Sequence, residues 1–219
     1  MGELRLYAIG IDEVQAMFGA SGELAERLRA QAHAALAPPE EVTPGGWRSK
    51  FGPIFRRVPG TPVIDPQAPR PEDLERILTG DYVPADRAVA TWQVMEVLIK
   101  ENSWGSTGLW SDGEQLESLD FALARGGVHA ADGLWHLLHQ RTELPLIVPD
   151  GLLVGYHSHE TAHRMGDSYR EAVPEIEDEQ QRATVTDLVD WLARFGGWAE
   201  TAATDGRPAP DLIAYWGVS

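Results

Sequence analysis

Two histidines and a glutamate near the middle of the chain have the types and the spacing of a zinc-dependent hydrolytic site. They are His159, Glu160 and His163, in the order H-E-x-x-H. On a helix, positions i and i+4 lie on the same face, so both imidazoles can bind one zinc ion. The glutamate can then act as a general base on a zinc-bound water. The motif therefore indicates hydrolysis assisted by zinc as one candidate activity.

The same residues also fit an ordinary helix start. Ser158 suits the N-cap position, and Glu160 lies in the first turn, where a negative charge interacts favourably with the helix dipole. The apolar residues that follow recur at helical spacing and mark the buried stripe of the helix: Ala162, Met165 and Tyr169. The two histidines then lie about 100° or more around the helix axis from the middle of this stripe. We therefore favour a solvated helix start over a metal site, and both interpretations stay open.

The sequence does not specify a third metal ligand. Gly166 extends the motif to H-E-x-x-H-x-x-G, which resembles the metzincin proteases. These enzymes need a ligand three residues later, where this chain has Tyr169, and usually an uncharged residue where it has Arg164. His157 can join the two histidines in an exposed cluster that binds zinc or nickel without catalysis. As in the gluzincins, a carboxylate can complete the site, and the acidic residues downstream are Glu175, Glu177, Glu179 and Asp187.

Two short apolar runs before the motif predict a β-hairpin. They span residues 146–148 and 152–154 and flank Pro149, Asp150 and Gly151. Proline presets φ, aspartate accepts hydrogen bonds within turns and glycine accepts positive φ, so these three residues suit a tight turn. Neither run alternates apolar with polar residues, so we expect both faces of the strands to be covered.

Patterns along the rest of the chain predict a helix-rich fold. Strands are expected at 4–10 and 212–216, and helices at 12–19, 21–37, 71–78, 84–100, 114–125, 133–141 and 181–203. Asp132 is the expected cap of the helix 133–141. The stretch 102–113 is rich in glycine and serine and is expected to be a loop. The chain is therefore predicted to be an α+β protein, in which several helices flank a small mixed β-sheet with the central hairpin.

The length of 219 residues fits a single domain, with a proline- and glycine-rich insertion or long loop at about 37–70. Trp47 lies in this insertion, among basic residues, and Trp104 and Trp110 lie in the loop 102–113. Tryptophan is enriched at binding hot spots, so these three are candidate partner-binding residues. They can equally be buried anchors of their loops. A small molecule bound under the loop 102–113 is a further interpretation.

The composition limits the partners. The formal net charge is −16, and a surface of that sign repels phosphate backbones and anionic lipids, so we expect no binding to nucleic acid or membranes. The acidity keeps the protein soluble or steers a basic protein partner toward it. The chain has no cysteine, no apolar run of about 20 residues and no signal-peptide pattern at its start. The cytoplasm is therefore the expected location.

Several short stretches resemble the YfbM-like family of bacterial proteins of unknown function. They are residues 6–14 (LYAIGIDEV), 132–139 (DGLWHLLH), 153–156 (LVGY) with the helix start at Glu160, and the final strand at 212–216. The resemblance implies an α+β domain in which helices flank a small sheet. It brings no established catalytic residues, and residues 37–84 have no counterpart in it. If the family has an ordinary helix start at this position, the two histidines of the motif are surface residues of that helix and bind no metal.

The sequence therefore predicts a non-enzymatic cytoplasmic protein-binding module without a cofactor, such as an immunity protein that neutralises a toxin. The charge, the three candidate tryptophans and the lack of a complete catalytic constellation support this interpretation. The alternative is a zinc-dependent hydrolase, with His159 and His163 as ligands and Glu160 as general base. The sequence contains no glycine-rich nucleotide fingerprint, P-loop or serine nucleophile elbow. Nothing in the sequence indicates the oligomeric state.

Overall fold

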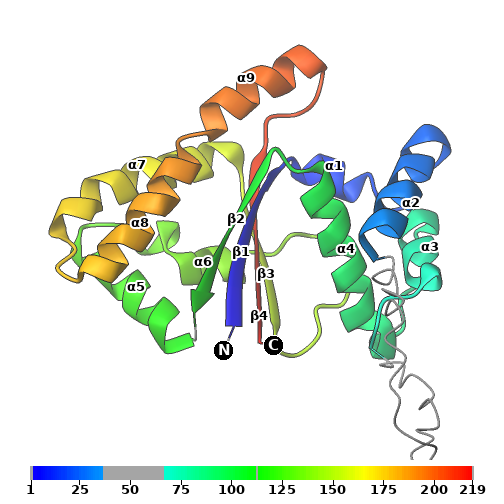
Figure 1. Ribbon diagram of the computed structural model, residues 1–219, viewed down its shortest axis with the longest axis horizontal. Helices are drawn as coiled ribbons and strands as arrows, with labels where there is room; N and C mark the ends of the chain where they lie inside the picture. Colours follow the sequence, from blue (N-terminus) through cyan, green and yellow to red (C-terminus); the bar gives the residue numbers. More distant parts are fainter. Residues whose placement is uncertain (1, 37–66, 112, 219) are drawn as a thin grey trace, which may run out of the picture.

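A four-stranded antiparallel sheet forms the middle layer of the protein. The computed structural model describes residues 2–36, 67–111 and 113–218. The strands follow the order β2-β1-β4-β3 across the sheet, and they are β1 (Gly2–Ile9), β2 (Gly105–Ser111), β3 (Leu152–His157) and β4 (Asp211–Val218). Strands β1 and β4 pair along their whole length, with Gly2 opposite Val218, so the two described ends of the chain lie side by side (Figure 1).

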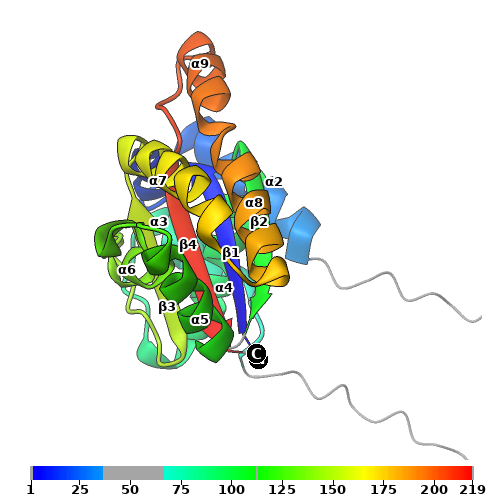
Figure 2. The same ribbon diagram turned by 90° about the vertical axis from the view of Figure 1, so that its left-hand side faces the viewer.

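Helices cover both faces of this sheet (Figure 1). One face carries α1 (Ile11–Gln15), α2 (Gly22–Leu36), α3 (Pro71–Thr79) and α4 (Ala88–Asn102). The other face carries α5 (Gly113–Arg125), α6 (Leu134–His139), α7 (His159–Ala172) and α8 (Glu179–Leu192). The last helix, α9 (Phe195–Asp205), projects beyond the end of the sheet (Figure 2). Short 3₁₀ helices lie between these elements: η1 (Ala85–Arg87), η2 (Ala130–Asp132) and η3 (Val173–Glu175).

The alternation of side chains along β1 divides the core between the two faces. Leu4 and Leu6 point to the α5–α8 side and join a buried cluster with apolar residues of those helices. Tyr7 and Ile9 point to the opposite side and join a second buried cluster with residues of α2, α3 and α4. Because helices cover both faces, the strands carry apolar residues on both sides, which explains why the apolar run at 152–154 does not alternate with polar residues.

Local signals set the ends of several helices. Pro71 opens α3, and Gly80 ends it in the left-handed conformation with a φ of 71°. The Ser158 side chain accepts a hydrogen bond from the backbone N–H of Thr161, so the predicted N-cap of α7 is confirmed. The helix-rich α+β fold that the sequence predicts is likewise confirmed.

The sheet differs from the prediction in its strand pairing. Among the described strands it is antiparallel throughout rather than mixed, and the first of the two apolar runs forms no strand. Strand β3 pairs with β4 instead, with Leu153 opposite Trp216, so the predicted central hairpin is wrong. Pro149 has no N–H to donate to a strand partner, and the carbonyl of Ile147 accepts the indole N–H of Trp92 at 2.8 Å. The first run is therefore tied to α4 as irregular backbone.

The stretch 102–113, expected to be a loop, contains the edge strand β2, and the long helix expected at 181–203 is interrupted. In β2, a Cβ atom on Gly105 would lie 2.6 Å from the ring of Trp198. Only glycine allows this close approach. Gly105 therefore lets strand β2 pack against Trp198, although the same residue suggests a loop in the sequence. In place of one long helix there are two, since α8 ends at Leu192 and α9 begins at Phe195.

The insertion predicted at about 37–70 falls mostly outside the described residues, and Trp47 falls outside them as well. Residues 67–70 form a turn that leads into α3. In the part of the chain that the structure describes, no helix is long and apolar enough to cross a membrane.

Candidate functional site

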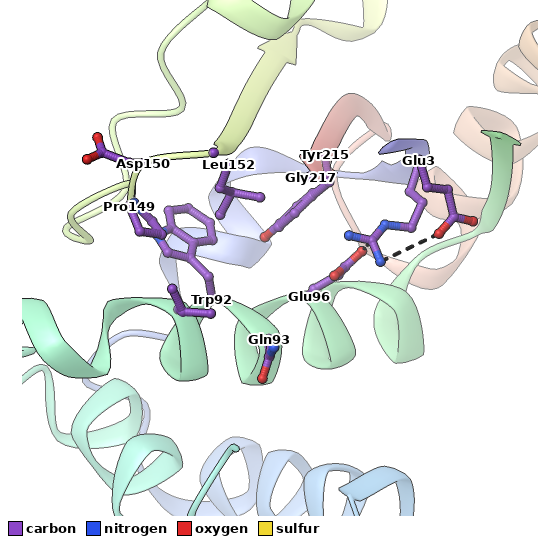
Figure 3. A pocket seen from close by; sticks show the side chains of 12 residues that line it. Glu3, Trp92, Gln93, Glu96, Pro149, Asp150, Leu152, Tyr215 and Gly217 are labelled. Atoms are coloured by element: carbon purple, nitrogen blue, oxygen red, sulfur yellow. Dashed lines mark ion pairs between the residues drawn. The ribbon is translucent and has the colours of Figure 1, made fainter. Parts of the chain in front are cut away.

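A cavity of about 350 Å³ lies between α4 and the sheet, at the end of the sheet where β1 begins and β4 ends (Figure 3). Its walls come from the start of β1, the first half of α4, the turn before β3 and the last residues of β4. The side chains that give the cavity its chemistry are Glu3, Arg5, Trp92, Glu96, Leu152 and Tyr215. Residues from both ends and from the middle of the chain thus meet around one space.

Strand and helix periodicity place these side chains. Arg5 lies on the α4 side of β1, because its two neighbours in the strand point to the other face. The antiparallel register sets Arg5 opposite Tyr215 of β4. On α4, Trp92 and Glu96 are four residues apart and therefore share the face that lines the cavity. The regular elements of the fold thus hold both the charged and the aromatic walls.

Charged side chains form one end of the cavity. The Arg5 Nε atom lies 2.8 Å from the Glu96 Oε1 atom, and the Arg5 Nη1 atom lies 3.8 Å from the Glu3 Oε2 atom. The Nε–H bond does not point along the first contact, so this contact is an ion pair rather than a directed hydrogen bond. Tyr7 donates its hydroxyl hydrogen to Glu96 at 2.7 Å. One guanidinium thus faces two carboxylates, and this end of the cavity is net negative.

Burial governs the ionisation of these side chains. Desolvation raises the pKa of the Glu96 carboxyl, while the hydrogen bond from Tyr7 and the charge of Arg5 lower it in part. Desolvation also raises the pKa of Tyr7 far above its usual value, and the neighbouring Glu96 adds to this shift. Tyr7 therefore stays a neutral hydrogen-bond donor, and Glu96 takes up a proton more readily than an exposed glutamate.

Mostly apolar side chains form the other end of the cavity and its mouth, with the exposed Asp150 beside them. Trp92, Pro149 and Leu152 lie at this end (Figure 3). Ile147 and Val148, immediately before Pro149, have exposed fractions of 52% and 44%. Large exposed apolar side chains are few among the described residues, and these two adjoin the cavity. The mouth therefore offers an apolar contact surface beside a charged interior.

The hydroxyl of Tyr215 is buried in the wall of the cavity without a hydrogen-bond partner among the described residues. The residue is 1% exposed, and its hydroxyl points into the space between Trp92 and Glu96 (Figure 3). Its ring packs edge-on against the rings of Tyr7 and Trp92, at 5.9 and 5.7 Å between centroids, so the hydroxyl is held in place. An unsatisfied buried hydroxyl costs about 1–3 kcal/mol, and a group that enters the cavity can supply the missing bond.

The cavity holds groups that can bind a ligand, and Glu96 is a carboxyl whose pKa burial raises. Covalent catalysis needs a nucleophile within hydrogen-bond reach of a base, and general acid–base catalysis needs a group poised to exchange a proton. Burial raises the pKa of Tyr215 well above its usual value, so its phenol stays neutral. The cavity thus presents the carboxylates of Glu3 and Glu96, compensated in part by a guanidinium, together with the exposed carboxylate of Asp150, a neutral hydroxyl and an apolar wall. Such groups can contact a ligand through charge, hydrogen bonding and packing.

The predicted zinc ligands stand in the first turns of α7, as the motif requires, and each makes local contacts. The backbone N–H of His159 donates to Asp211 at 2.8 Å, and its Nδ1 atom lies 2.9 Å from the carbonyl oxygen of Pro210. The His163 side chain is 57% exposed, and its Nδ1 atom lies 3.4 Å from an Asp167 oxygen. Both histidines therefore use Nδ1 within the protein, and Nε2 is the atom through which either can bind a metal.

The other residues predicted for a zinc site lie apart from this pair. His157 is 7% exposed, and its ring stacks on that of His136 of α6 with 5.9 Å between centroids. Glu160 is exposed in the first turn of α7. Among the described residues, no group of three histidine, cysteine or acidic side chains is arranged to hold a metal ion. The zinc site therefore has no third ligand in this part of the chain, and metal binding stays a prediction.

The three candidate tryptophans have different surroundings. Trp104 is partly buried against the core of the α5–α8 side, and the Arg207 guanidinium carbon lies 4.3 Å from its ring centroid. These surroundings fit a residue that anchors its own segment to the core, which is the alternative considered for Trp104. Trp104 does not line the cavity beside α4. Trp110 belongs to β2, opposite Glu3 of β1. Trp47 lies outside the described residues, so partner contacts at these positions stay a prediction.

Sequence patterns do not single out the residues of the cavity, although two signals are present. Arg5 interrupts an otherwise apolar strand, and Glu96 lies four residues after Trp92, on the side of the helix expected to be buried. A charge at a buried position indicates a partner or a function, because burial without compensation is costly. Tyr215 carries no such signal, since a tyrosine within a final apolar strand is an ordinary core residue.

A family model matches almost the whole chain. Residues 1–217 match a domain of unknown function, DUF7691. No curated protein matches the sequence, and no solved structure matches it. These comparisons do not address the resemblance to the YfbM-like family, which stays a prediction.

Proposed function

The chain belongs to the family of the domain of unknown function DUF7691, and we propose that it is a non-enzymatic module that binds a basic protein partner. The cavity between α4 and the sheet is the binding site in this proposal. A single observation carries it: a buried tyrosine hydroxyl without a described partner points into a cavity with a net negative end and an apolar mouth. Such a cavity accepts a cationic group from a surface that also covers the mouth.

The charge of the protein supports a basic partner. The formal net charge of −16 attracts basic proteins over a distance and repels acidic ones. At short range, the carboxylates of Glu3 and Glu96 outnumber the guanidinium of Arg5 within the cavity. The long-range field and the local charge of the site thus favour the same kind of partner.

The apolar mouth supports a protein as the partner rather than a small molecule. Ile147 and Val148 are exposed, although Pro149 and Leu152 directly beyond them line the cavity. The hydrogen bond from Trp92 to the carbonyl of Ile147 fixes this segment on α4, so the surface is preorganised for contact. Protein interfaces combine an apolar centre with a few specific polar contacts, and this is the combination at the mouth.

A cytoplasmic immunity protein that neutralises a toxin is the specific form of this proposal. Neutralisation requires tight binding and no chemistry, which fits a site made of carboxylates, a phenol hydroxyl and apolar side chains. The proposal involves no cofactor. It also involves no nucleic acid, because the negative surface repels phosphates.

Affinity capture with matched variants tests this function. The immobilised protein is expected to retain a basic protein from an extract of the source cells and to release it as the salt concentration rises, because salt screens the attraction. A double variant, Ile147→Ser with Val148→Ser, is expected to lose most of this retention. Phe121→Ser alters an apolar residue of α5 that is 67% exposed, on the other side of the sheet, and is expected to keep it. Retention of no basic protein, or equal retention by both variants, would contradict the proposal.

The zinc-dependent hydrolase stays the alternative, and the metal content of the protein decides between the two. We expect no stoichiometric zinc after purification without added metal and extensive dialysis, because the described residues supply no third ligand beside His159 and His163. About one zinc per chain, lost in His159→Ala, would instead establish a metal site. Mass spectrometry of the metal content measures this directly, and a substrate screen would then follow.

A further inference from the structure

We propose that the cavity between α4 and the sheet binds the side-chain ammonium of a lysine presented by the partner. This inference rests on the proposed function and names the group that the same site recognises. It assigns one occupant to the cavity, a lysine on a protein surface. Three properties of the cavity select this group: the net charge of its polar end, the hydroxyl of Tyr215, and the apolar wall that leads inward from the mouth.

The polar end selects a cation over an anion. Arg5 faces the carboxylates of Glu3 and Glu96, at 3.8 and 2.8 Å, so its positive charge is already compensated. An added anion would meet two carboxylates, whereas an added cation brings this end to neutrality. The Glu96 side chain is only 16% exposed, so water and salt screen it weakly, and a cation beside it interacts strongly.

The hydroxyl of Tyr215 selects a hydrogen-bond donor. Its oxygen faces the cavity between the charged and the apolar ends (Figure 3) and has no partner among the described residues. An ammonium has three N–H donors, so it can donate to this oxygen and to the carboxylate of Glu96 together. A neutral alkyl group would fill the same space but leave the hydroxyl unsatisfied.

The apolar wall selects a methylene chain behind the charge. Trp92, Pro149 and Leu152 line the end of the cavity near the mouth. The methylene groups of a lysine can pack against these side chains while the ammonium lies further inside. The rings of Trp92 and Tyr215 also attract a cation that lies near them. The volume of about 350 Å³ is sufficient for such a side chain, because small-ligand pockets begin at about 300 Å³.

The exposed residues at the mouth favour a lysine within a protein over a free amine. Ile147 and Val148 directly precede Pro149 of the cavity wall, and about half of each residue is exposed. A free amine would leave them exposed, whereas the surface around a protein lysine would cover them. A lysine between apolar neighbours is therefore expected to bind more tightly than an alkylamine of the same length.

A titration followed by backbone amide chemical shifts tests this inference. The probes are a short peptide with one lysine between apolar residues, the same peptide with norleucine at that position, and butylamine. The lysine peptide is expected to shift the amide signals of β1, α4 and β4 around the cavity, and to bind about tenfold more tightly than either other probe. Norleucine keeps the methylene chain without the charge, and butylamine keeps the charge without the apolar neighbours.

Two variants locate the binding in the cavity. Tyr215→Phe removes only the hydroxyl, and Glu96→Gln removes only the negative charge. Each variant is expected to bind the lysine peptide with an affinity lower by about fivefold or more. Tyr169→Phe and Glu101→Gln are the matched controls. The Tyr169 hydroxyl donates to the carbonyl of Asp132 on the other side of the sheet, and Glu101 is exposed near the far end of α4. Both controls are expected to bind the peptide as the unmodified protein does.

The outcomes separate this inference from the proposed function. Equal binding of the lysine and norleucine peptides, or equal binding by Tyr215→Phe and the unmodified protein, would overturn the lysine site while capture of a basic partner could still succeed. Equal affinity for butylamine and the lysine peptide would overturn the choice of a protein lysine. Specific binding of the peptide by a protein that captures no basic partner would support the site and contradict the proposed function.

Discussion

At the scale of single residues, buried polar atoms without a described partner lie in two different surroundings. The Tyr215 hydroxyl faces the cavity beside α4, whereas the Nε2 atom of His157 lies where its ring stacks on His136 of α6. A ligand can satisfy a group that faces a cavity, while a group enclosed by packing reduces the stability of the fold. Each atom therefore has its own measurable effect on the free energy of unfolding.

Removal of the Tyr215 hydroxyl is expected to stabilise the fold. Tyr215→Phe keeps the ring contacts with Tyr7 and Trp92 and removes a hydroxyl without a described partner, so the free energy of unfolding should rise by about 1 kcal/mol. Tyr169→Phe removes a hydroxyl that donates to the carbonyl of Asp132 at 2.9 Å, and it should lower that free energy by about 1–2 kcal/mol. Urea denaturation measures both changes. Similar losses in the two variants would show that the Tyr215 hydroxyl has a partner in solution.

His157 makes the free energy of unfolding depend on pH. Burial lowers the pKa of its imidazole from 6.5 to about 4, with His136 and Arg164 adding to the shift and Asp132 opposing it. Between these two values the unfolded chain binds a proton that the folded His157 does not. Stability therefore falls as the pH drops from about 6.5 toward about 4, by up to about 3 kcal/mol. At higher pH both states are neutral at this residue and the effect is absent.

A variant isolates this contribution of His157. His157→Phe keeps a ring against His136 but does not titrate, so its free energy of unfolding should fall less on acidification than that of the unmodified protein. His163→Gln changes an exposed histidine of α7 and should keep the full acid sensitivity. Denaturant unfolding at neutral pH and at about pH 5 measures the difference. The same acid sensitivity in His157→Phe and the unmodified protein would show that His157 is not held neutral in the fold.

At the scale of elements, side chains distant in sequence orient the helices. Asp120 of α5 accepts hydrogen bonds from the backbone N–H groups of Leu134 and Trp135, at 2.7 and 3.3 Å, and so caps the start of α6 from another helix. The sequence indicates Asp132 for this role because it stands just before the helix, and that prediction is wrong. Asp132 lies in η2 and pairs with Arg164 of α7 at 2.8 Å.

Local patterns predict most elements of this fold and little of the site. Pro71 and Ser158 act on backbone within a few residues, so the sequence suffices for the starts of α3 and α7. Strand β2 is missed because it forms through pairing with β1, against the preference of its own glycines and serines. The cavity is missed because Arg5, Glu96 and Tyr215 meet only through the tertiary fold.

A buried ion pair ties α3 to the segment before α4. Asp73 is fully buried and accepts hydrogen bonds from Arg87, from the backbone N–H of Arg70 at 2.9 Å and from Arg76 at 3.2 Å. Burial by itself raises the pKa of Asp73, but these hydrogen bonds and charges hold it below its usual value. Asp73→Asn is expected to lower the free energy of unfolding by about 3–5 kcal/mol, because an amide does not offset the charge of the guanidinium beside it.

An ion pair on the surface provides the control for Asp73. Glu75 of α3 contacts Arg29 of α2 at 2.7 Å, and about half of each side chain is in contact with solvent. Glu75→Gln should cost much less stability than Asp73→Asn, because water solvates both partners once the pair is broken. Urea unfolding of the two variants side by side measures the difference. Equal losses would show that burial does not strengthen the interactions of Asp73.

At the scale of the whole molecule, the sheet separates two candidate surfaces. The cavity and its apolar mouth lie on the α4 side, lined by the first residues of β1 and the last residues of β4. The two described chain ends meet at this end of the sheet (Figure 1). The H-E-x-x-H helix α7 and the exposed Phe121 of α5 lie on the opposite side. A partner that binds through the cavity therefore contacts one side of the protein and leaves the other free.

Site-specific photo-crosslinking tests this central claim most directly. A photoreactive amino acid replaces Val148, beside the mouth of the cavity, or Phe121, on the opposite side of the sheet, and mass spectrometry identifies what each position links. We predict that position 148 links a basic protein through a peptide that contains a lysine, and that position 121 links little or nothing. Equal crosslinking from both positions, or an acidic protein linked at position 148, would contradict binding through the cavity beside α4.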